Sequence, residues 1–215
     1  DKKIALIGPL ADDSDAPIGN WRAKGKESSA ISLLEGLKNN CDTKNLFYAK
    51  GCNLSIGPNN FFQELLINNS DTSGFSSAIE IASNCDVVVM ALGETAFMSG
   101  EGRSRSNLDL PGIQKQLLKK IYEVNPNVVL VLMNGRPLTI EWESDNIPSI
   151  LETWHCGTMA GEAIARILFG KENPSGKLTM TFPRNVGQIP TFYNKKSTGR
   201  PSSNPGQVFY SHHTD

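Results

Sequence analysis

The chain has 215 residues, 39% of them hydrophobic, and its 21 Lys and Arg residues nearly balance its 22 Asp and Glu residues. This length is enough for one large domain or two small ones with a sizeable core. The near-neutral charge, without a basic stripe, argues against nucleic acid as a partner, and no apolar run approaches the roughly 20 residues that span a membrane. Because the sequence begins at Asp1, without an initiator Met, we expect a segment of a longer protein.

Apolar runs of strand length alternate with amphipathic, helix-like segments through most of the chain. Strands are predicted at Lys2–Pro9 (with its closing turn), Asn45–Ala49, Val87–Glu94, Asn127–Met133, Ser149–Trp154 and, as an alternating edge strand, Leu178–Phe182. Helices are predicted at Ser28–Leu37, Phe75–Asn84, Ile113–Val124 and Glu162–Leu168, with a loop carrying one short helix at Ser55–Ser73 and a short helix or strand at Leu138–Trp142.

This alternation predicts an α/β fold, in which a mostly parallel sheet of about six strands carries helices on both faces, as an α/β sandwich. We expect this domain to cover residues 1–183. Residues 184–215 have little periodicity and are rich in Gly, Pro, Ser, Asn and Lys. We expect them to form an extended C-terminal tail packed on the domain.

The most informative stretch is the apolar run Val87–Glu94 and the loop that follows it, Thr95–Arg105. A short β-branched run is typical of a strand buried on both faces, and ligand chemistry in open α/β sheets gathers in loops at the carboxyl ends of such strands. Glu101 lies between two glycines, so its carboxylate is on a flexible backbone. The residues alone leave two interpretations open: a reactive carboxylate, or an exposed one paired with Arg103 or Arg105.

Trp21 lies in a polar, glycine-bearing loop after the first strand, so it could be a lid over the core or a platform on which a sugar stacks. The sequence holds no G-x-x-x-x-G-K-[ST] phosphate loop, no G-x-S-x-G elbow and no G-x-G-x-x-G after the first strand. No Ser and Asp accompany His155, His212 or His213 in a catalytic pattern. Carboxylates and aromatic side chains in loops at one sheet edge remain, and these suit carbohydrate. No cofactor is expected.

The four cysteines, Cys41, Cys52, Cys85 and Cys156, form no C-x-x-C pair, so a zinc site is not expected. Cys85 and Cys156 border predicted strands, and we interpret both as small buried hydrophobic residues. Cys41 and Cys52 flank a predicted strand and could form a disulfide in an oxidising compartment. The sequence leaves their state open.

Several motifs around and beyond Glu101 occur together. They are Leu92–Glu94 (LGE), Ser99–Gly102 (SGEG) with Arg105, Leu110–Gln114 (LPGIQ), Ile7–Asp12 with Gly19–Trp21, Val131–Leu138 (VLMNGRPL), Phe169–Leu178 (FGKENPSGKL) with Thr181–Pro183, Gln188–Pro190, Tyr193–Asn194 and Thr198–Pro201. In combination they resemble the second, C-terminal domain of family-3 glycoside hydrolases, which are β-glucosidases and β-xylosidases. The last three segments are similar to the periplasmic β-glucosidase branch, and the resemblance covers nearly the whole chain.

The resemblance implies a retaining mechanism shared by two domains, in which a (β/α)8-type barrel supplies the nucleophilic Asp and this domain supplies the acid/base. The matching acid/base position is Glu101. Trp21 matches an aromatic residue of the leaving-group subsite, and Thr198 and Arg200 are expected to line the same mouth. Arg105 is expected to brace the loop by pairing with a carboxylate.

The implied substrate is an oligosaccharide or aryl β-glycoside with a terminal β-D-glycosidic bond, from which glucose or xylose would be released. The implied partner is the N-terminal barrel domain of the same polypeptide, with neither nucleic acid nor membrane involved. The implied location is periplasmic or secreted. Because no residue of this chain replaces the nucleophile, we expect the isolated chain to fold but to have little or no hydrolase activity.

One loop departs from the family pattern. His155–Gly161 has Cys156 where relatives often have Pro or Ala, and Met159–Ala160 where a more acidic or glycine-rich pair is usual. Two other interpretations remain. The chain could be a non-catalytic sugar-binding or interaction module of the same fold, with Glu101 only structural, or a nucleotide-binding α/β domain, which the missing glycine fingerprints disfavour.

Overall fold

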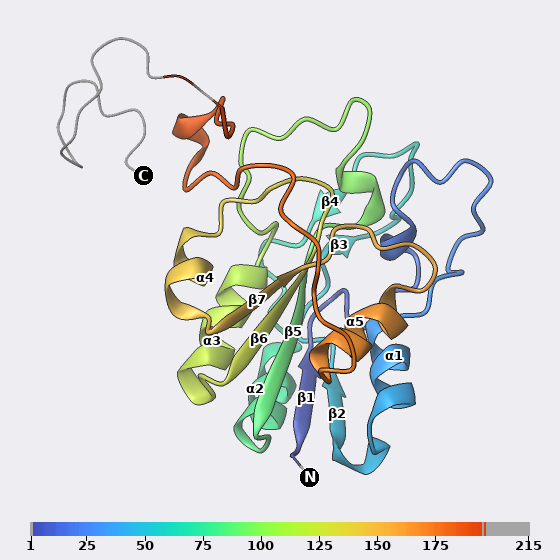
Figure 1. The fold of residues 1–215 in the computed structure, drawn as a ribbon, viewed down its shortest axis with the longest axis vertical. Helices are drawn as coiled ribbons and strands as arrows, with labels where there is room; N and C mark the ends of the chain where they lie inside the picture. The colour runs from blue at the N-terminus through green and yellow to red at the C-terminus, as the bar shows by residue number, and fades with distance from the viewer. Residues whose placement is uncertain (1, 195, 197–215) are drawn as a thin grey trace, which may run out of the picture.

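A computed structural model describes residues 2–194 and 196 of the chain. Five parallel strands form its main sheet in the order β2-β1-β5-β6-β7 (Figure 1). Their bounds are β1 Ile4–Ile7, β2 Leu46–Ala49, β5 Val87–Gly93, β6 Val128–Met133 and β7 Ser149–Glu152. The winding reverses between β1 and β5, and an open α/β sheet forms its ligand crevice at the carboxyl edge of such a point.

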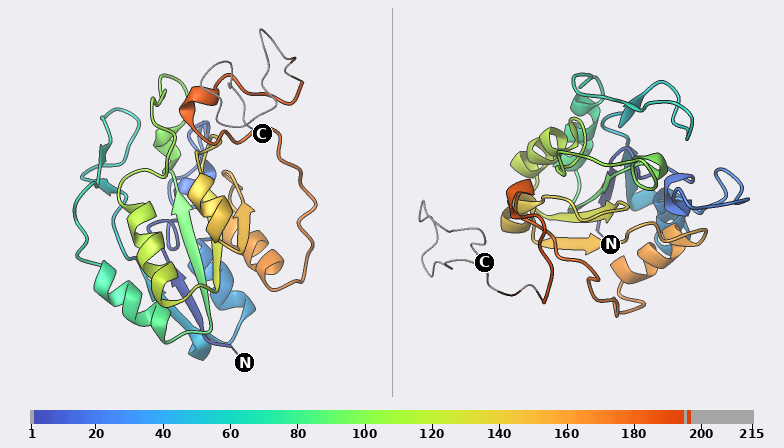
Figure 2. Two further views of the ribbon diagram at one scale, coloured as in Figure 1. Left: turned by 90° about the vertical axis from the view of Figure 1, so that its left-hand side faces the viewer. Right: turned by 90° about the horizontal axis from the view of Figure 1, so that it is seen from above.

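Helices cover both faces of this sheet, as Figure 2 shows. α1 (Leu33–Asn40) and α5 (Ala160–Leu168) pack together on one face. α2 (Phe75–Ser83) and α3 (Gln114–Val124) pack together on the other, and the short α4 (Glu141–Asn146) precedes β7. This arrangement confirms the α/β sandwich predicted from the sequence. Among the helices of residues 2–194, none combines the length and hydropathy needed to cross a membrane.

Four single-turn 3-10 helices complete the described secondary structure. They are η1 (Ala16–Ile18), η2 (Thr43–Asn45), η3 (Ala96–Met98) and η4 (Val186–Gln188). η1 and η3 belong to the loops that follow β1 and β5, and they contact each other at the carboxyl edge of the sheet.

β5 is the central strand because both of its edges and both of its faces are covered. β1 pairs along one edge and β6 along the other, with Gly93 opposite Met133 at the last rung. Met90 enters the core beneath α2 and α3, and its neighbours Val89 and Ala91 enter the core beneath α1 and α5. Successive side chains of one strand point to opposite faces, so a strand between two cores must be apolar throughout.

α1 begins later than the sequence predicts. Its N-cap is Ser32 rather than Ser28, because Ser32 Oγ accepts a hydrogen bond from Glu35 N at 3.2 Å. Ser28 has a φ of 53°, outside the right-handed helical region, so the helix cannot extend back to it.

The asparagine-rich stretch before α2 forms a β-hairpin rather than the predicted loop with a short helix. β3 (Ser55–Ile56) and β4 (Leu66–Ile67) pair antiparallel. Asn60 fixes the turn between them, since its Oδ1 accepts hydrogen bonds from Phe62 N and Gln63 N at 3.0 and 3.1 Å. Such bonds from a side chain to the local backbone compete with helix formation, which explains why the predicted short helix does not form here.

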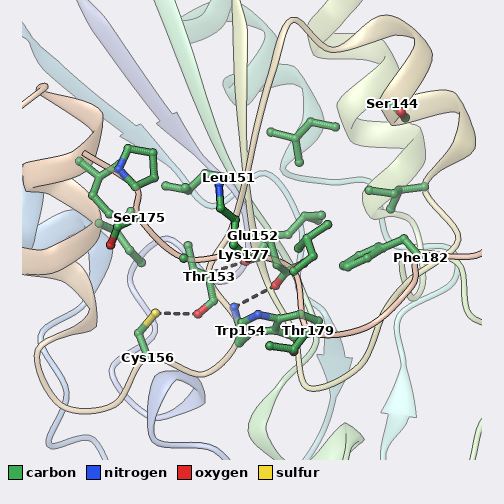
Figure 3. A pocket seen from close by; sticks show the side chains of 18 of the residues that line it. Ser144, Leu151, Glu152, Thr153, Trp154, Cys156, Ser175, Lys177, Thr179 and Phe182 are labelled. Carbon is green, nitrogen blue, oxygen red and sulfur yellow. Dashed lines mark hydrogen bonds between the residues drawn. The ribbon is translucent and has the colours of Figure 1, made fainter. Parts of the chain in front are cut away.

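The main sheet has five strands, not about six, because Leu178–Phe182 does not join it as a strand. This segment and β7 instead line a common cavity of about 970 Å³ (Figure 3). The ring of Phe182 packs against that of Trp154, with centroids 5.8 Å apart. An alternating apolar pattern shows that a segment can form a strand, but it does not show which sheet edge the strand will pair with. Here the segment contacts the end of β7 through side chains rather than through backbone hydrogen bonds.

All four cysteines have free thiols. Cys41 and Cys52, whose pairing the sequence left open, form no disulfide. Cys52 is buried, and its burial raises the pKa of its thiol to about 11. Cys156 is exposed, so its interpretation as a buried hydrophobic residue is wrong; its Sγ donates a hydrogen bond to Thr153 O at the end of β7.

Candidate functional site

Four loops meet at the carboxyl edge of the sheet, following β1, β5, β6 and β7. A Cβ on Gly135 would lie 1.9 Å from Ser99 Oγ, so the loop after β6 approaches the loop after β5 more closely than any other residue type would allow. A Cβ on Gly19 would lie 3.4 Å from His155 Cβ, which places the loop after β1 against the loop after β7. The four loops therefore form one packed surface.

A buried carboxylate, Glu94, lies at the centre of this edge, directly after β5. Its side chain is 0% exposed, and its Oε1 lies 2.6 Å from Arg105 Nη1 and 3.1 Å from Arg136 Nε. Its Oε2 accepts a hydrogen bond from Gly135 N at 3.2 Å. A charge removed from water needs such compensation, which two guanidinium groups and a backbone N–H supply. We call Glu94, Arg105 and Arg136 the clamp.

The clamp holds the backbone on both sides of Glu101. Arg136 Nη2 donates hydrogen bonds to Met98 O and, at 2.8 Å, to Arg103 O. The guanidinium group is planar and carries several donors in a fixed geometry, so one side chain can hold two carbonyls and a carboxylate at once. The base of the loop is thereby fixed, while the residues at its tip lie outside the clamp.

Glu101 lies at the tip of this loop with its side chain exposed. Its two glycine neighbours have φ values of 117° and 68°, which side-chain-bearing residues rarely adopt. The sequence left open an ion pair between Glu101 and Arg103 or Arg105. Arg105 pairs with Glu94 instead, and Arg103 donates a hydrogen bond to Phe61 O at 2.5 Å. Within the described part of the chain, Glu101 forms no ion pair.

Trp21 is 73% exposed, so the interpretation as a lid over the core is wrong. Its neighbours are held in place on both sides. Asn20 Nδ2 donates a hydrogen bond to Ser99 O at 2.9 Å, and Arg22 pairs with Asp15. Trp21 therefore follows a residue that is bonded to the loop after β5, and most of its side chain is open to solvent.

The other two residues that the sequence places in substrate binding, Thr198 and Arg200, lie outside the described residues. Among the predicted site residues that the structure describes, Trp21, Arg105 and Glu101 all belong to loops at the carboxyl edge. These residues therefore belong to one surface, although they come from two loops about 80 positions apart in the sequence.

The sequence alone did not identify the buried Glu94, its partner Arg136 or the partly buried Glu152 at this edge. Glu152, at the end of β7, accepts hydrogen bonds from Trp154 N at 2.9 Å and from Asn134 Nδ2 at 3.3 Å. Burial, assisted by the negative charge of Glu94, raises the pKa of Glu152 to about 7. The available signal was a charged residue at the carboxyl end of an apolar strand, where it faces the loops rather than the core.

His155 does not provide nucleophilic chemistry. Its Nε2 lies 3.5 Å from Ser99 Oγ, at the long limit of a hydrogen bond, and no carboxylate of the described residues hydrogen-bonds to the ring. Burial lowers the pKa of His155. Residues 2–194 and 196 also contain no cluster of His, Cys, Asp and Glu that could hold a metal ion. The chemistry available at this edge is that of carboxylates, guanidinium groups and exposed aromatic rings.

Known proteins share this sequence and this fold. The family model described as "Glycosyl hydrolase family 3 C-terminal domain" matches residues 1–213. The periplasmic beta-glucosidase of Salmonella typhimurium is 40% identical over 206 residues, which are 92% of this chain. The beta-xylosidase of Formosa agariphila is 42% identical over 197 residues, which are 89% of this chain. The crystal structure of a beta-glucosidase from Listeria innocua in complex with glucose is similar over 100% of this chain, with a TM-score of 0.83 and 36% identity.

The chain spans only about a quarter of the length of these relatives. It covers 27% of the Salmonella protein, 25% of the Formosa protein and 28% of the crystallised Listeria chain. The larger part of each relative therefore has no counterpart among these 215 residues.

Proposed function

Because this chain belongs to glycosyl hydrolase family 3, as its C-terminal domain, we propose that it supplies the general acid/base, Glu101, to a retaining β-glucosidase or β-xylosidase. The full protein would hydrolyse terminal β-D-glycosidic bonds in oligosaccharides or aryl β-glycosides. The nucleophilic carboxylate would come from the N-terminal barrel domain of the same polypeptide. The isolated chain would accordingly be inactive.

A retaining glycosidase needs two carboxyl groups about 5–5.5 Å apart on either side of the anomeric carbon. In the first step Glu101 would donate its proton to the leaving oxygen while the nucleophile forms the glycosyl-enzyme bond. In the second step the ionised Glu101 would take a proton from water as that water attacks the anomeric carbon and the bond to the nucleophilic carboxylate breaks. Each role requires the carboxyl group to reach outward from this domain.

One observation carries the proposal: a carboxylate at an exposed, glycine-flanked tip on a loop whose base is clamped. The clamp fixes Met98 O and Arg103 O through Arg136, while Glu101 itself has no ion-pair partner in the described part of the chain. A catalytic group must be held within about 0.5 Å of its working position, and a rigid base serves this requirement. A structural carboxylate would instead be expected to pair within its own domain.

We propose supporting roles for the other residues of this surface. Arg105 would brace the loop through Glu94, and Trp21 would stack against the leaving group. Thr198 and Arg200 would line the same mouth. Residues 1–183 would form the α/β sandwich and 184–215 a tail packed on it. A periplasmic or secreted location is proposed from the name of the Salmonella relative.

Substitution of Glu101 in the full-length parent enzyme tests the proposal. Glu101→Gln and Glu101→Gly should keep kcat/KM for an aryl glycoside with a good leaving group and lose about 100-fold or more in kcat/KM with a poor one, since only the latter needs a proton in the first step. The second step needs a base with either substrate, so kcat should fall for both. Azide should restore turnover of the activated substrate and yield a glycosyl azide. Glu80→Gln, an exposed carboxylate on α2, is the matched control.

Two results would contradict the proposal. If Glu101→Gln shows the leaving-group dependence of wild type and of the Glu80 control, the catalytic proton comes from another residue. In that case, sugar binding that Glu101→Gln leaves intact and Trp21→Ala abolishes would identify the domain as a non-catalytic sugar-binding module. Robust turnover by the isolated 215-residue chain would refute the requirement for a second domain.

A further inference from the structure

The β3–β4 hairpin presents two phenylalanine rings at its turn. Phe62 is 93% exposed and Phe61 is 46% exposed, and their rings meet edge to face with centroids 5.6 Å apart. Exposed phenylalanines next to each other leave a sizeable apolar area in water, which marks a contact site more often than an ordinary surface. The turn is not loose, because Asn60 holds the backbone N–H of Phe62 and also donates from Nδ2 to Gln63 Oε1 at 3.1 Å.

This hairpin turn is attached directly to the loop that carries Glu101. Arg103 donates a hydrogen bond to Phe61 O, and its guanidinium carbon lies 5.5 Å from the centre of the Phe61 ring. Thr95 Oγ1 donates a second hydrogen bond, to Asn59 Oδ1 at 3.1 Å. The turn therefore keeps a fixed relation to both ends of the loop after β5.

Trp21 is attached to the same loop on its other flank. The hydrogen bond from Asn20 Nδ2 to Ser99 O joins the loop after β1 to one flank of the loop after β5. The hydrogen bond from Arg103 to Phe61 O joins the hairpin to the other flank. Figure 2, in its right-hand view, shows the loop after β5 between the β3–β4 hairpin and the loop after β1. Each flank of this loop is thus bonded to a segment that carries an exposed aromatic residue, Trp21 on one flank and Phe62 on the other.

Resting on the proposed function, we infer that Phe62, supported by Phe61 and Arg103, is a second carbohydrate-stacking surface that binds the next sugar of an extended leaving group. The apolar face of a pyranose ring covers a phenyl ring well, and the surrounding amides of Asn60 and Gln63 offer hydrogen-bonding groups of the kind that hydroxyl groups need. Trp21 would hold the first leaving-group sugar and Phe62 the second. The enzyme would therefore prefer β-linked trisaccharides to disaccharides.

The test compares β-linked di- and triglucosides as substrates of the full-length parent enzyme. Phe62→Ala should raise KM for the trisaccharide about 5- to 10-fold, the loss expected for one aromatic stacking contact, and leave KM for the disaccharide within about twofold. Phe62→Trp should retain the trisaccharide preference because it keeps a ring. Leu66→Ala, an exposed apolar residue of the same hairpin, is the control for general effects on the hairpin.

Sugar affinity measured by calorimetry separates this inference from the acid/base assignment. In a Glu101→Gln background, trisaccharide affinity should still fall on Phe62→Ala, whether or not Glu101 proves to be the acid/base. Equal effects on both substrates would place Phe62 at the first sugar and overturn the inference. A fall in Tm for Phe62→Ala beyond that of Leu66→Ala, with activity lost on both substrates, would identify the ring as a contact with the N-terminal domain and overturn it too. An unchanged KM for the trisaccharide would also refute it.

Discussion

Replacing Glu152 by Gln should make the chain more stable than wild type at alkaline pH. Burial raises the pKa of Glu152 to about 7 in the folded chain, from an ordinary value of 4.5. Folding therefore favours the protonated acid, and ionisation destabilises the native state. The difference between the two values corresponds to about 3 kcal/mol in the free energy of unfolding.

Stability changes with pH because the folded and unfolded chains release this proton at different pH values. Below pH 4.5 the acid is protonated in both states, and its full contribution is present. Between pH 4.5 and about 7 the unfolded chain releases its proton first, so stability falls with rising pH and becomes constant above the folded pKa. The substituted glutamine would not ionise, and the variant would avoid this loss. Because an amide cannot accept both hydrogen bonds that the carboxylate receives, we subtract about 1 kcal/mol and expect a net gain of about 2 kcal/mol at pH 8.

Urea denaturation of the chain, followed by tryptophan fluorescence at pH 4.5 and pH 8, measures this effect. The wild type should lose stability between the two pH values relative to Glu152→Gln. Glu80→Gln, an exposed carboxylate on α2, controls for the general effect of removing one charge. If Glu152→Gln shows the same pH dependence as the control, or is less stable than wild type at pH 8, ionisation of Glu152 does not destabilise the folded chain.

Two further predictions concern the surface around Glu101. Arg136→Lys keeps a charge beside Glu94, but a lysine cannot bond to both Met98 O and Arg103 O, so the free energy of unfolding should fall by about 2 kcal/mol. In the full-length enzyme, kcat should fall by a larger factor than KM changes. A wild-type kcat in this variant would contradict the role of the clamp. Gly135→Ala places a Cβ 1.9 Å from Ser99 Oγ and should lower both Tm and kcat. Adding Ser99→Gly to the same chain should restore Tm. If Tm is not restored, the added methyl group clashes with another residue.

The sequence predicted the core of the fold because each central strand is marked locally. β5 and β6 are apolar runs bounded by polar residues, which is the sequence pattern of a parallel strand that is buried on both faces. The loop with Glu101 could be placed at the carboxyl edge for the same reason, since it follows β5 directly. Local chemistry was sufficient wherever the strand and its loop are adjacent in the sequence.

Features that depend on distant partners could not be predicted in this way. Arg136 meets Glu94 only because β5 and β6 pair with Gly93 opposite Met133, a register that no local pattern specifies. Leu178–Phe182 alternates as a strand should, but whether β7 accepts it depends on the surrounding packing. The hairpin before α2 depends on the side chain of Asn60, whose hydrogen bonds to Phe62 N and Gln63 N compete with helix formation.

The pairing of β5 with β6 also determines when the surface around Glu101 forms. The clamp joins Glu94 to Arg136, 42 positions away, so it closes only after the two strands have paired up to their carboxyl ends. The loop with Glu101 would then be among the last segments to order during folding and among the first to loosen on warming. A gently heated enzyme would lose activity reversibly while its core stayed intact, so its working temperature would be set by the opening of this loop rather than by global melting.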